Sequence, residues 1–400
     1  VNWLGRPGAR YQSDRQNRKA APLTSNGRLF MQGLHRVIAL DAFSGQALWN
    51  VELPSMARFN VPRDCANSCA EGEEYFLAMQ GFLFEFDGEE GHIKRQLPVQ
   101  AGARDDFEWD WGYVAATPRR IVGTPVKAGA PFTAWWGGDA WYDAREGEAA
   151  KKVCGDGIFG LDRASGDLAW QRSGSLVLHP TITIADGAVS FLECRNTELL
   201  GADARRIGSS KLWEDLWLVS LDLQTGQVLW EREATPVPGR VAIYLAQSDG
   251  KLVMVSSAGG EFAVYAFDAG NGASLWRRKF TWEVDHHGKS LSRPLIVNGK
   301  VYLRPAVMDL ETGEPQAQPF PEGHQCGTYV ASKNALFLRA GELAVWDVLE
   351  GRSTRWKRLR PDCWISTIPA EGMLLSPEGG GGCSCGTWIQ NIAQVVLIFR

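Results

Sequence analysis

The 400-residue sequence contains no apolar run of the roughly 18–20 residues that a membrane-spanning helix requires. Apolar stretches such as VVLIF at 395–399 have the length of a β-strand. The sequence also lacks a basic tract. Its 42 Lys and Arg stand against 46 Asp and Glu, for a formal net charge of −4. Nucleic acid is therefore a poor match as a partner.

Catalytic signatures are equally scarce. The sequence has no Gly-x-Ser-x-Gly elbow, no Ser-His-Asp context, no zinc-protease helix, and only six His. Nothing in it nominates a nucleophile. The chain begins at Val1 with neither Met nor a signal peptide. We therefore expect a mature or trimmed fragment of a longer precursor.

What the sequence does have is a repeat. An apolar strand ends in Asp, Gly follows four residues later, and Trp usually follows four residues after the Gly. The clear copies are ALDAFSGQALW, GLDRASGDLAW, SLDLQTGQVLW and AFDAGNGASLW, anchored at Asp41, Asp162, Asp222 and Asp268. Weaker copies begin at Asp87, Asp309 and Asp347. We expect Asp to cap a tight turn, Gly to supply a positive φ, and Trp to wedge between neighbouring units.

Successive Asp anchors are 38 to 75 residues apart, a period typical of one four-stranded propeller blade per repeat. A second unit, usually an Asn-Gly or Asp-Gly turn followed by a short apolar strand, lies upstream of each of the seven anchors. It occurs an eighth time near the end of the chain, where no Asp anchor follows. We therefore predict an all-β fold, an eight-bladed propeller of four-stranded antiparallel blades, with seven blades as the alternative. One propeller domain would occupy residues 1–400.

Strand order within a blade then places all the short turns on one face, the bottom. The loops between the second and third strands, and the connections between blades, lie on the opposite face, the top. The longest top loops are predicted at 123–157 and 193–212. Because variable loops on a rigid scaffold usually carry function, we look for the site on the top face.

The repeat resembles the pyrroloquinoline-quinone (PQQ) type of propeller repeat, with its A-x-D-x-x-T-G-x-x-x-W signature. Residues 28–50, 158–172, 217–232 and 262–278 match it best. That repeat is shared by quinoprotein alcohol dehydrogenases and by a non-catalytic outer-membrane-assembly propeller. Roughly the C-terminal third, including GHQCGTYVASKNALFLRAG, resembles bacterial secreted PQQ-like propellers, a resemblance that brings no activity with it.

The sequence departs from the dehydrogenases at their cofactor site. They are similar to one another in carrying a vicinal Cys–Cys ring and a Ca²⁺ or lanthanide site beside a catalytic Asp. Here no two Cys are adjacent, and no matching metal-binding block is recognisable. PQQ is thus a possible cofactor that no identified residue supports.

The eight Cys form an even set, which favours disulfides and an extracytoplasmic location, periplasmic or secreted. All eight are expected on or near the top face. We predict a Cys154–Cys194 bridge, two bridges among Cys326, Cys363, Cys383 and Cys385, and a local closure between Cys65 and Cys69 unless that pair is the exception. A thiolate metal site and free buried thiols are the alternatives.

Several polar residues are predicted at the top ends of the inner strands. Asp285, His286 and His287 form DHHGK in a connection between blades, where one His could act as a base or ligate a metal, or simply bond to backbone. His179 and His324 occupy similar positions in other blades, so with His287 they could form a shared site or a mononuclear Cu or Zn centre.

Basic residues are predicted at the same level. Arg63 and Asp64 are predicted at the top of another inner strand, and Arg293 and Arg304 flank a later hairpin. They could form a salt-bridge network between blades or a clamp for an anionic ligand.

Two functions remain open from the sequence. The first is an extracytoplasmic module that binds a protein partner or a small ligand on its Cys-braced top face. The second is a quinoprotein or metal-dependent oxidoreductase with its site in the top funnel, using Asp285, His286, His287 and Arg304.

Overall fold

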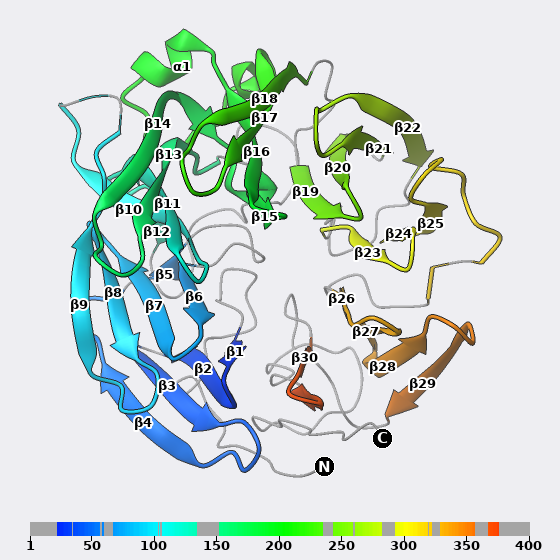
Figure 1. Cartoon of the computed structure of the whole chain (residues 1–400), viewed down its shortest axis with the longest axis horizontal. Coiled ribbons are helices and arrows are strands. Elements are labelled where there is room, and N and C mark those ends of the chain that lie inside the picture. The colour runs from blue at the N-terminus through cyan, green and yellow to red at the C-terminus, as the bar shows by residue number, and fades with distance from the viewer. Residues whose placement is uncertain are drawn as a thin grey trace.

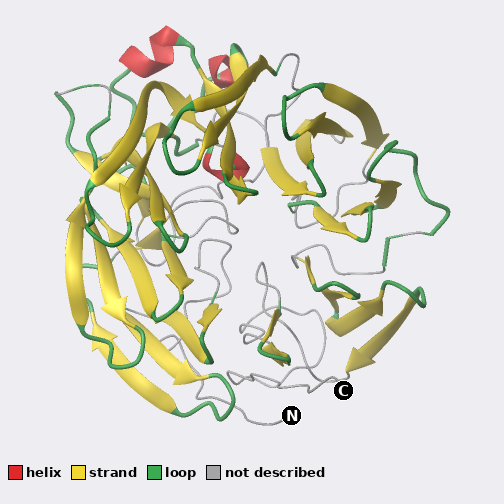
Figure 2. Cartoon of the chain, viewed as in Figure 1, coloured by secondary structure: helices red, strands yellow, loops and turns green. Residues whose placement is uncertain are grey.

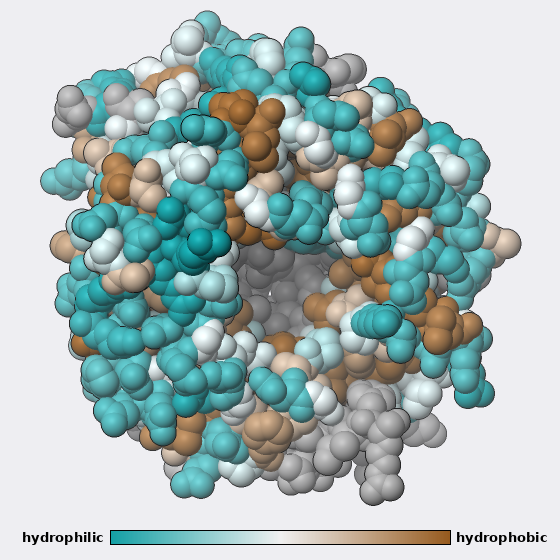
Figure 3. All heavy atoms as spheres, viewed as in Figure 1, coloured by the Kyte–Doolittle hydropathy of each residue, from teal (hydrophilic) through white to brown (hydrophobic). Residues whose placement is uncertain are grey.

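A computed structural model describes residues 22–33, 35–56, 58–59, 67–102, 104, 106–133, 152–234, 243–258, 261–281, 293–318, 320–321, 329–356 and 367–375. Antiparallel sheets stand around a central axis, and a hollow lies at the centre of the ring (Figures 1 and 3). The predicted all-β propeller is confirmed.

The described strands group into eight successive units, here called blades 1 to 8. Blade 1 comprises β1 (Leu23–Ser25), β2 (Arg28–Gly33), β3 (Arg36–Asp41) and β4 (Ala47–Glu52). Blade 2 comprises β6 (Ser68–Glu71), β7 (Glu74–Met79), β8 (Phe82–Asp87) and β9 (Ile93–Pro98). Blade 3 comprises β10 (Trp109–Ala116), β11 (Arg120–Lys127), β13 (Gly155–Asp162) and β14 (Leu168–Val177). Blade 4 comprises β15 (Thr183–Ala185), β16 (Ala188–Cys194), β17 (Leu216–Asp222) and β18 (Val228–Glu233).

The second half follows the same plan with fewer described strands. Blade 5 comprises β19 (Ile243–Ser248), β20 (Lys251–Ala258), β21 (Glu261–Asp268) and β22 (Ser274–Thr281). Blade 6 comprises β23 (Leu295–Val297), β24 (Lys300–Leu303) and β25 (Ala306–Asp309). Blade 7 comprises β26 (Tyr329–Ala331), β27 (Ala335–Ala340), β28 (Glu342–Asp347) and β29 (Arg352–Trp356). Blade 8 comprises β30 (Ile368–Ala370) and β31 (Met373–Leu375), and β5 (Arg58–Phe59) pairs with β12 (Phe132–Thr133) outside the blades.

Helical segments gather on blades 3 and 4, where Figure 2 draws them in red. They are η1 (His179–Thr181), α1 (Thr197–Gly201) and η2 (Ser210–Trp213). The outer strand β14 also pairs with β16 at Leu176–Cys194 and Val177–Glu193, which joins these two blades into one sheet.

The apolar core is divided among the interfaces between blades. Each pair of consecutive blades shares one cluster of buried side chains. Another cluster joins Leu29 and Ile38 of blade 1 to Met373 and Leu375 of blade 8, and so closes the ring. Eight interfaces fit the predicted eight blades.

Each Asp of the repeat caps its turn as expected. In blade 4, Asp222 Oδ1 accepts hydrogen bonds from the backbone N–H of Gln224 at 3.0 Å and of Thr225 at 2.8 Å. The other six anchors accept the two equivalent bonds. The Gly of every turn has a φ between +66° and +83°, a region that L-residues with a Cβ enter only at a cost.

The Trp of the repeat ties its blade to the next one. The indole N–H donates to the carbonyl of the residue that follows the next blade's Asp. The bonds are Trp49 to Gly88 at 2.9 Å, Trp170 to Leu223 at 3.0 Å, Trp230 to Ala269 at 2.8 Å and Trp276 to Leu310 at 2.9 Å. Each indole also lies against the Gly of that next turn, where a Cβ would come within 2.5–2.6 Å of the ring. The Gly therefore serves both the turn and the interface.

Blade 2 has Arg95 where blades 1, 3, 4 and 5 have Trp. Its guanidinium donates to the carbonyls of Arg163 and of Ala164, the latter at 2.9 Å. Because Arg163 follows Asp162, Arg95 bonds to the same backbone position as the indoles do. A cation with several N–H donors thus replaces the Trp tie between blades 2 and 3.

Candidate functional site

The two longest top loops are joined to each other. They connect β11 to β13 in blade 3 and β16 to β17 in blade 4. Lys152 and Ile207 exchange backbone hydrogen bonds of 2.7 and 2.9 Å between these loops, and Arg206 Nε donates to the Ala130 carbonyl at 2.8 Å. Neither loop can move independently without breaking these bonds. We call the described parts of the two loops, 128–133 with 152–154 and 195–215, the top platform.

The short helix α1 forms the outer part of the top platform. Asn196 caps its first turn by accepting from the N–H of Glu198 at 3.1 Å. Its C-terminal end is held by blade 3, since Lys127 Nζ donates to the Ala202 carbonyl at 2.5 Å and Arg104 Nη1 donates to the Gly201 carbonyl at 2.9 Å. The platform is therefore pre-organised, which reduces the ordering entropy that binding would otherwise cost.

Both cations that hold α1 also stack on one aromatic ring. The Arg104 guanidinium carbon lies 4.5 Å from the centroid of the Phe107 ring, and Lys127 Nζ lies 4.6 Å from it. These contacts fix the two side chains from the blade side. Asp203, Ala204 and Arg205, which follow α1, are exposed. The platform thus offers a polar surface of both charges on a fixed support.

A buried acid lies beneath the platform. Asp156, on β13, is 6% exposed, and its Oδ1 lies 4.0 Å from Lys127 Nζ. Burial raises the pKa of Asp156 from 3.8 to about 6, although the Lys127 charge lowers it in part. The Asp156 carboxyl group therefore changes charge in a pH range where most carboxylates stay ionised.

We expect Asp156→Asn to remove a pH dependence of stability. The folded pKa lies above the unfolded one, so the folded state binds the proton more tightly between pH 4 and 6. The contribution of Asp156 to the free energy of unfolding should fall over that window by about 3 kcal/mol and then stay level. Urea unfolding at pH 4.5, 5.5 and 7 should show the variant gaining stability relative to the native protein as pH rises. A constant difference at the three pH values would contradict the buried, titrating Asp156.

A second buried carboxylate braces the base of the blade 4 loop. Glu193 is fully buried on β16 and accepts from Arg172 Nε at 3.0 Å and Nη2 at 2.6 Å. Ser175 Oγ at 2.6 Å and Arg195 Nε at 2.8 Å complete its shell. Arg195 in turn contacts Glu231 at 2.7 Å. The network connects the outer strand of blade 3 to two strands of blade 4, β16 and β18.

The predicted site residue His179 is fully buried in η1. Its Nε2 lies 2.9 Å from Thr124 Oγ1, and within the described part of the chain its Nδ1 has no hydrogen-bond partner. Burial lowers the pKa of His179 to about 3, so the imidazole is neutral at physiological pH. It is placed as an interface residue between blades 3 and 4 and is poorly suited to proton exchange with a ligand.

Arg293 braces the inner ends of blades 4 and 5. Its Nη1 donates to the Leu245 carbonyl at 2.5 Å and its Nη2 to the Pro180 carbonyl at 2.8 Å. Pro180 follows His179, so the structure brings these two predicted residues together. Arg304 lies apart from them, with its guanidinium carbon 5.5 Å from the Phe320 ring centroid and 5.9 Å from that of Tyr329.

The remaining predicted site residues lie outside the described residues. They are Arg63, Asp64, Asp285, His286, His287 and His324. The shared His site and the Asp285–His287 site therefore stay predictions. Across the residues that the structure does describe, no group of three or more His, Cys, Asp or Glu is arranged to hold a metal ion.

The predicted Cys154–Cys194 bridge is wrong, because both residues are free thiols. The prediction treated them as loop residues. Cys194 instead ends β16 in the core, where its thiol donates to the Glu214 carbonyl at 3.4 Å, and Cys154 is buried beside β13. Backbone bonds between Lys152 and Ile207 join the two loops in its place. Burial raises the pKa of both thiols.

Cys69 is also a free thiol, on β6. The predicted closure between Cys65 and Cys69 is therefore not made, which leaves this pair as the exception that the sequence allowed. The described ranges do not include Cys65, which was the predicted partner of Cys69. They also do not include Cys326, Cys363, Cys383 and Cys385. The two bridges predicted among the last four stay predictions.

Sequence reasoning missed Lys127, Asp156 and Glu193. The available signal was a charge inside an apolar strand, as in SFLECR around Glu193. Such a charge is costly to bury without a partner, and the partners Arg172 and Arg195 could not be assigned without knowing how β14 pairs with β16.

Comparison with known proteins matches residues 214–351 to a family model described as outer membrane protein assembly factor BamB. No curated protein sequence matches the chain. In the described residues, no helix is long and apolar enough to cross a membrane.

Solved structures share the fold over most of the chain. BamB from Moraxella catarrhalis has 17% sequence identity and a TM-score of 0.50, covering 80% of this chain and 82% of its own. Quinohemoprotein alcohol dehydrogenase from Comamonas testosteroni has 12% identity and a TM-score of 0.54, covering 94% and 71%. The computationally designed Ika8 protein has 15% identity and a TM-score of 0.62, covering 100% of both chains. At these identities the likeness shows the fold alone.

Proposed function

We propose that this chain, which in its repeats and fold is a PQQ-like β-propeller, acts as an extracytoplasmic module that binds a ligand or assembles with a protein partner. The observation that supports the proposal is the top platform, in which two long loops of neighbouring blades are joined by a β-bridge and anchored on blade 3. A fixed, exposed, polar surface of this kind suits recognition by another protein.

The extracytoplasmic part of the proposal rests on the family match and on the resemblance of the repeats to secreted propellers. It does not depend on a Cys154–Cys194 bridge. The protein partner is proposed by analogy with the name of the matched family, an outer membrane protein assembly factor. Which protein binds, and in which compartment, are questions for the experiment.

The predicted site residues that the structure describes do not assemble a site for a bound quinone cofactor. PQQ carries several carboxylates, so its site needs available cations. Arg293 uses both terminal nitrogens for backbone carbonyls, and His179 is buried and neutral. Arg304 lies against two aromatic rings. We therefore derive no catalytic step through PQQ from these residues.

The oxidoreductase alternative gives the first test. Purified protein incubated with PQQ and Ca²⁺ should reduce no electron-accepting dye when it is offered a panel of alcohols. Absorbance and metal analysis of natively purified protein should show neither a quinone nor a stoichiometric metal. Robust turnover, or a bound quinone, would contradict a pure binding role.

The binding role has its own test. A photo-cross-linking amino acid at the exposed Ala204, on the top platform, should give a discrete cross-linked species in the source cells. The matched control is the same amino acid at Ser274, which is exposed on the outer strand of blade 5. Equal cross-linking at the two positions, or none at Ala204, would contradict partner docking on the platform.

A further inference from the structure

The bottom face carries a depression of about 630 Å³ beneath blades 5, 6 and 7. It is formed by the β-turns of three consecutive blades: Ser248–Asp249 in blade 5, Val297–Asn298 in blade 6 and Ser332–Lys333 in blade 7, together with Leu310 from the Asp turn of blade 6. All of these turns lie on the face opposite the top platform. The depression is therefore separate from the site proposed above, and its volume is in the range of small-molecule and peptide sites.

The walls of the depression are held in place from blade to blade. Asn298 Nδ2 donates to the Lys333 carbonyl at 3.1 Å, which joins blade 6 to blade 7. The Leu310 carbonyl accepts the Trp276 indole N–H at 2.9 Å, which joins blade 5 to blade 6. Within blade 6, the Leu310 N–H donates to the Gly299 carbonyl at 2.9 Å. The site is thus pre-organised by the same ties that build the ring.

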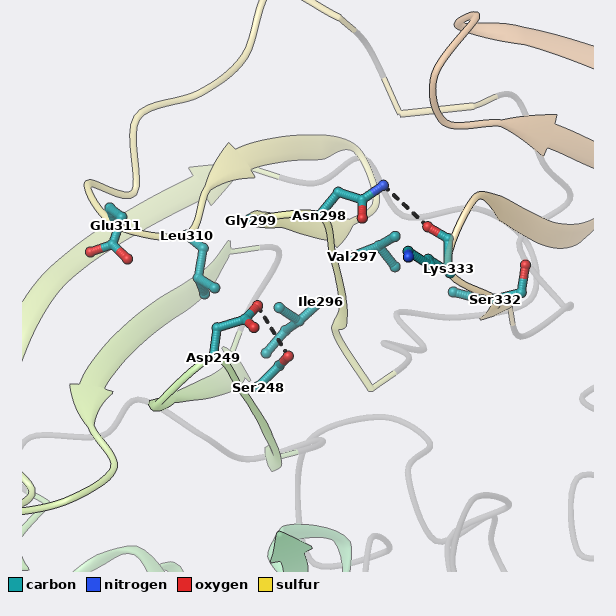
Figure 4. A pocket seen from close by; sticks show the side chains of 11 residues that line it. Ser248, Asp249, Ile296, Val297, Asn298, Gly299, Leu310, Glu311, Ser332 and Lys333 are labelled. Carbon is teal, nitrogen blue, oxygen red and sulfur yellow. Dashed lines mark hydrogen bonds between the residues drawn. The ribbon is translucent and has the colours of Figure 1, made fainter. Parts of the chain in front are cut away.

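The charges in the depression are separated by an apolar centre. Figure 4 shows Asp249 and Lys333 on opposite sides of Ile296 and Val297. The nearby Glu311 is paired with Lys251 at 2.5 Å, which offsets part of its charge. Asp249 accepts a hydrogen bond from Ser248 Oγ at 3.2 Å. Over the described ranges, neither Asp249 nor Lys333 forms an ion pair, and both charges face a ligand uncompensated.

We propose that this depression binds a short zwitterionic peptide with an aliphatic side chain. Asp249 would accept the peptide ammonium, and Lys333 would pair with its carboxylate. The aliphatic side chain would lie against Ile296, which is half-buried, at the centre of the depression. One negative end, one positive end and an apolar centre match such a ligand in order, whereas an anion or a cation alone would meet one like charge. Because both charges are exposed to water, the affinity should be modest, with a Kd on the order of 1 mM.

The tripeptide Gly-Leu-Gly is the probe, tested by calorimetry or by NMR titration of the full chain. Saturable binding is expected. Blocking its N-terminus by acetylation or its C-terminus by amidation should weaken binding by about two- to fivefold each, as loss of one exposed ion pair does. Replacing the central Leu by Gly should weaken it further through lost apolar contact.

Two variants link each charge of the peptide to one residue. Asp249→Asn should weaken binding of the free peptide but leave the N-acetylated peptide unaffected, and Asn tolerates the φ of +50° at this position. Lys333→Gln should likewise weaken binding of the free peptide but leave binding of the C-amidated peptide unaffected. The control is Lys279→Gln, because Lys279 is an exposed cation on the outer strand β22, away from the depression.

The outcomes decide the proposal. It is overturned if Gly-Leu-Gly shows no saturable binding at about ten times the expected Kd, or if Asp249→Asn and Lys333→Gln affect free and blocked peptides equally. It is also overturned if Lys279→Gln weakens binding as much as Lys333→Gln does. Failure here would leave the top-face proposal intact, because cross-linking at Ala204 reports on the other face.

Discussion

Gly226→Ala should lower the free energy of unfolding by about 2–5 kcal/mol. Gly226 has a φ of +69°, where an L-residue with a Cβ costs about 1–2 kcal/mol. The added Cβ would also lie 2.6 Å from Cγ of Trp170. That ring cannot withdraw freely, because its N–H is bonded to the Leu223 carbonyl at 3.0 Å. Overpacking of this kind typically costs a further 1–3 kcal/mol.

Gly250→Ala is the matched control. Gly250 lies in the β19–β20 turn with a φ of +70°, but nothing would lie within 4 Å of its Cβ. The Gly250→Ala variant should therefore lose only about 1–2 kcal/mol of stability, from the conformational cost of the positive φ. Urea unfolding of both variants, compared at their midpoints and slopes, measures the difference. Equal losses would show that the Trp170 ring yields, and that the Gly of the repeat is needed for the turn alone.

The repeat could be predicted because its chemistry is local. Asp222, Thr225 and Gly226 make their contacts within one turn, and the φ requirement at Gly226 needs no partner. The Trp wedge was also predictable in kind, since Trp recurs near the start of four outer strands. Its hydrogen bond to the next blade was not, because the acceptor is a backbone carbonyl that any sequence supplies. The Arg95 replacement shows this, since it bonds to the same backbone position with different chemistry.

The top face was harder to predict because its contacts are not local. The β-bridge between Lys152 and Ile207 joins residues 55 positions apart and leaves no sequence signature. Eight Cys suggested a covalent brace, yet Cys194 falls at the end of a core strand instead of in a loop. Arg293 precedes β23, and its two donors bind the carbonyls of Leu245 and Pro180. A sequence shows which residues carry charge, not which partner neutralises it.

Glu193→Ala should be strongly destabilising, by about 3–5 kcal/mol, because the partly buried Arg172 and Arg195 lose their enclosed carboxylate and keep only the exposed Glu231. Arg172 meets Glu193 through two bonds of 3.0 and 2.6 Å, and Arg195 adds a third of 2.8 Å. The side chain of Glu193 has no exposed surface.

Acid should reduce the same stabilisation in the native protein. Burial alone would raise the pKa of Glu193, but hydrogen bonds from Arg172 and Ser175 and the charge of Arg172 lower it below the usual 4.5. A folded pKa below the unfolded one means that the stabilisation is fully present above the unfolded value and is lost as pH falls through the folded one. The difference between the native protein and Glu193→Ala should thus be largest near pH 7 and shrink in acid.

Glu231→Ala tests whether the effect comes from burial. Glu231 contacts the same two Arg, at 3.3 and 2.7 Å, but its side chain is 37% exposed on the outer strand β18. Its loss should cost no more than about 1 kcal/mol, as for other exposed pairs. Urea unfolding of the two variants at pH 7 compares them directly. Because Arg172 and Arg195 stay present in both, a loss at Glu231 equal to that at Glu193 would mean that total charge, and not the enclosed geometry at β16, stabilises the junction between blades 3 and 4.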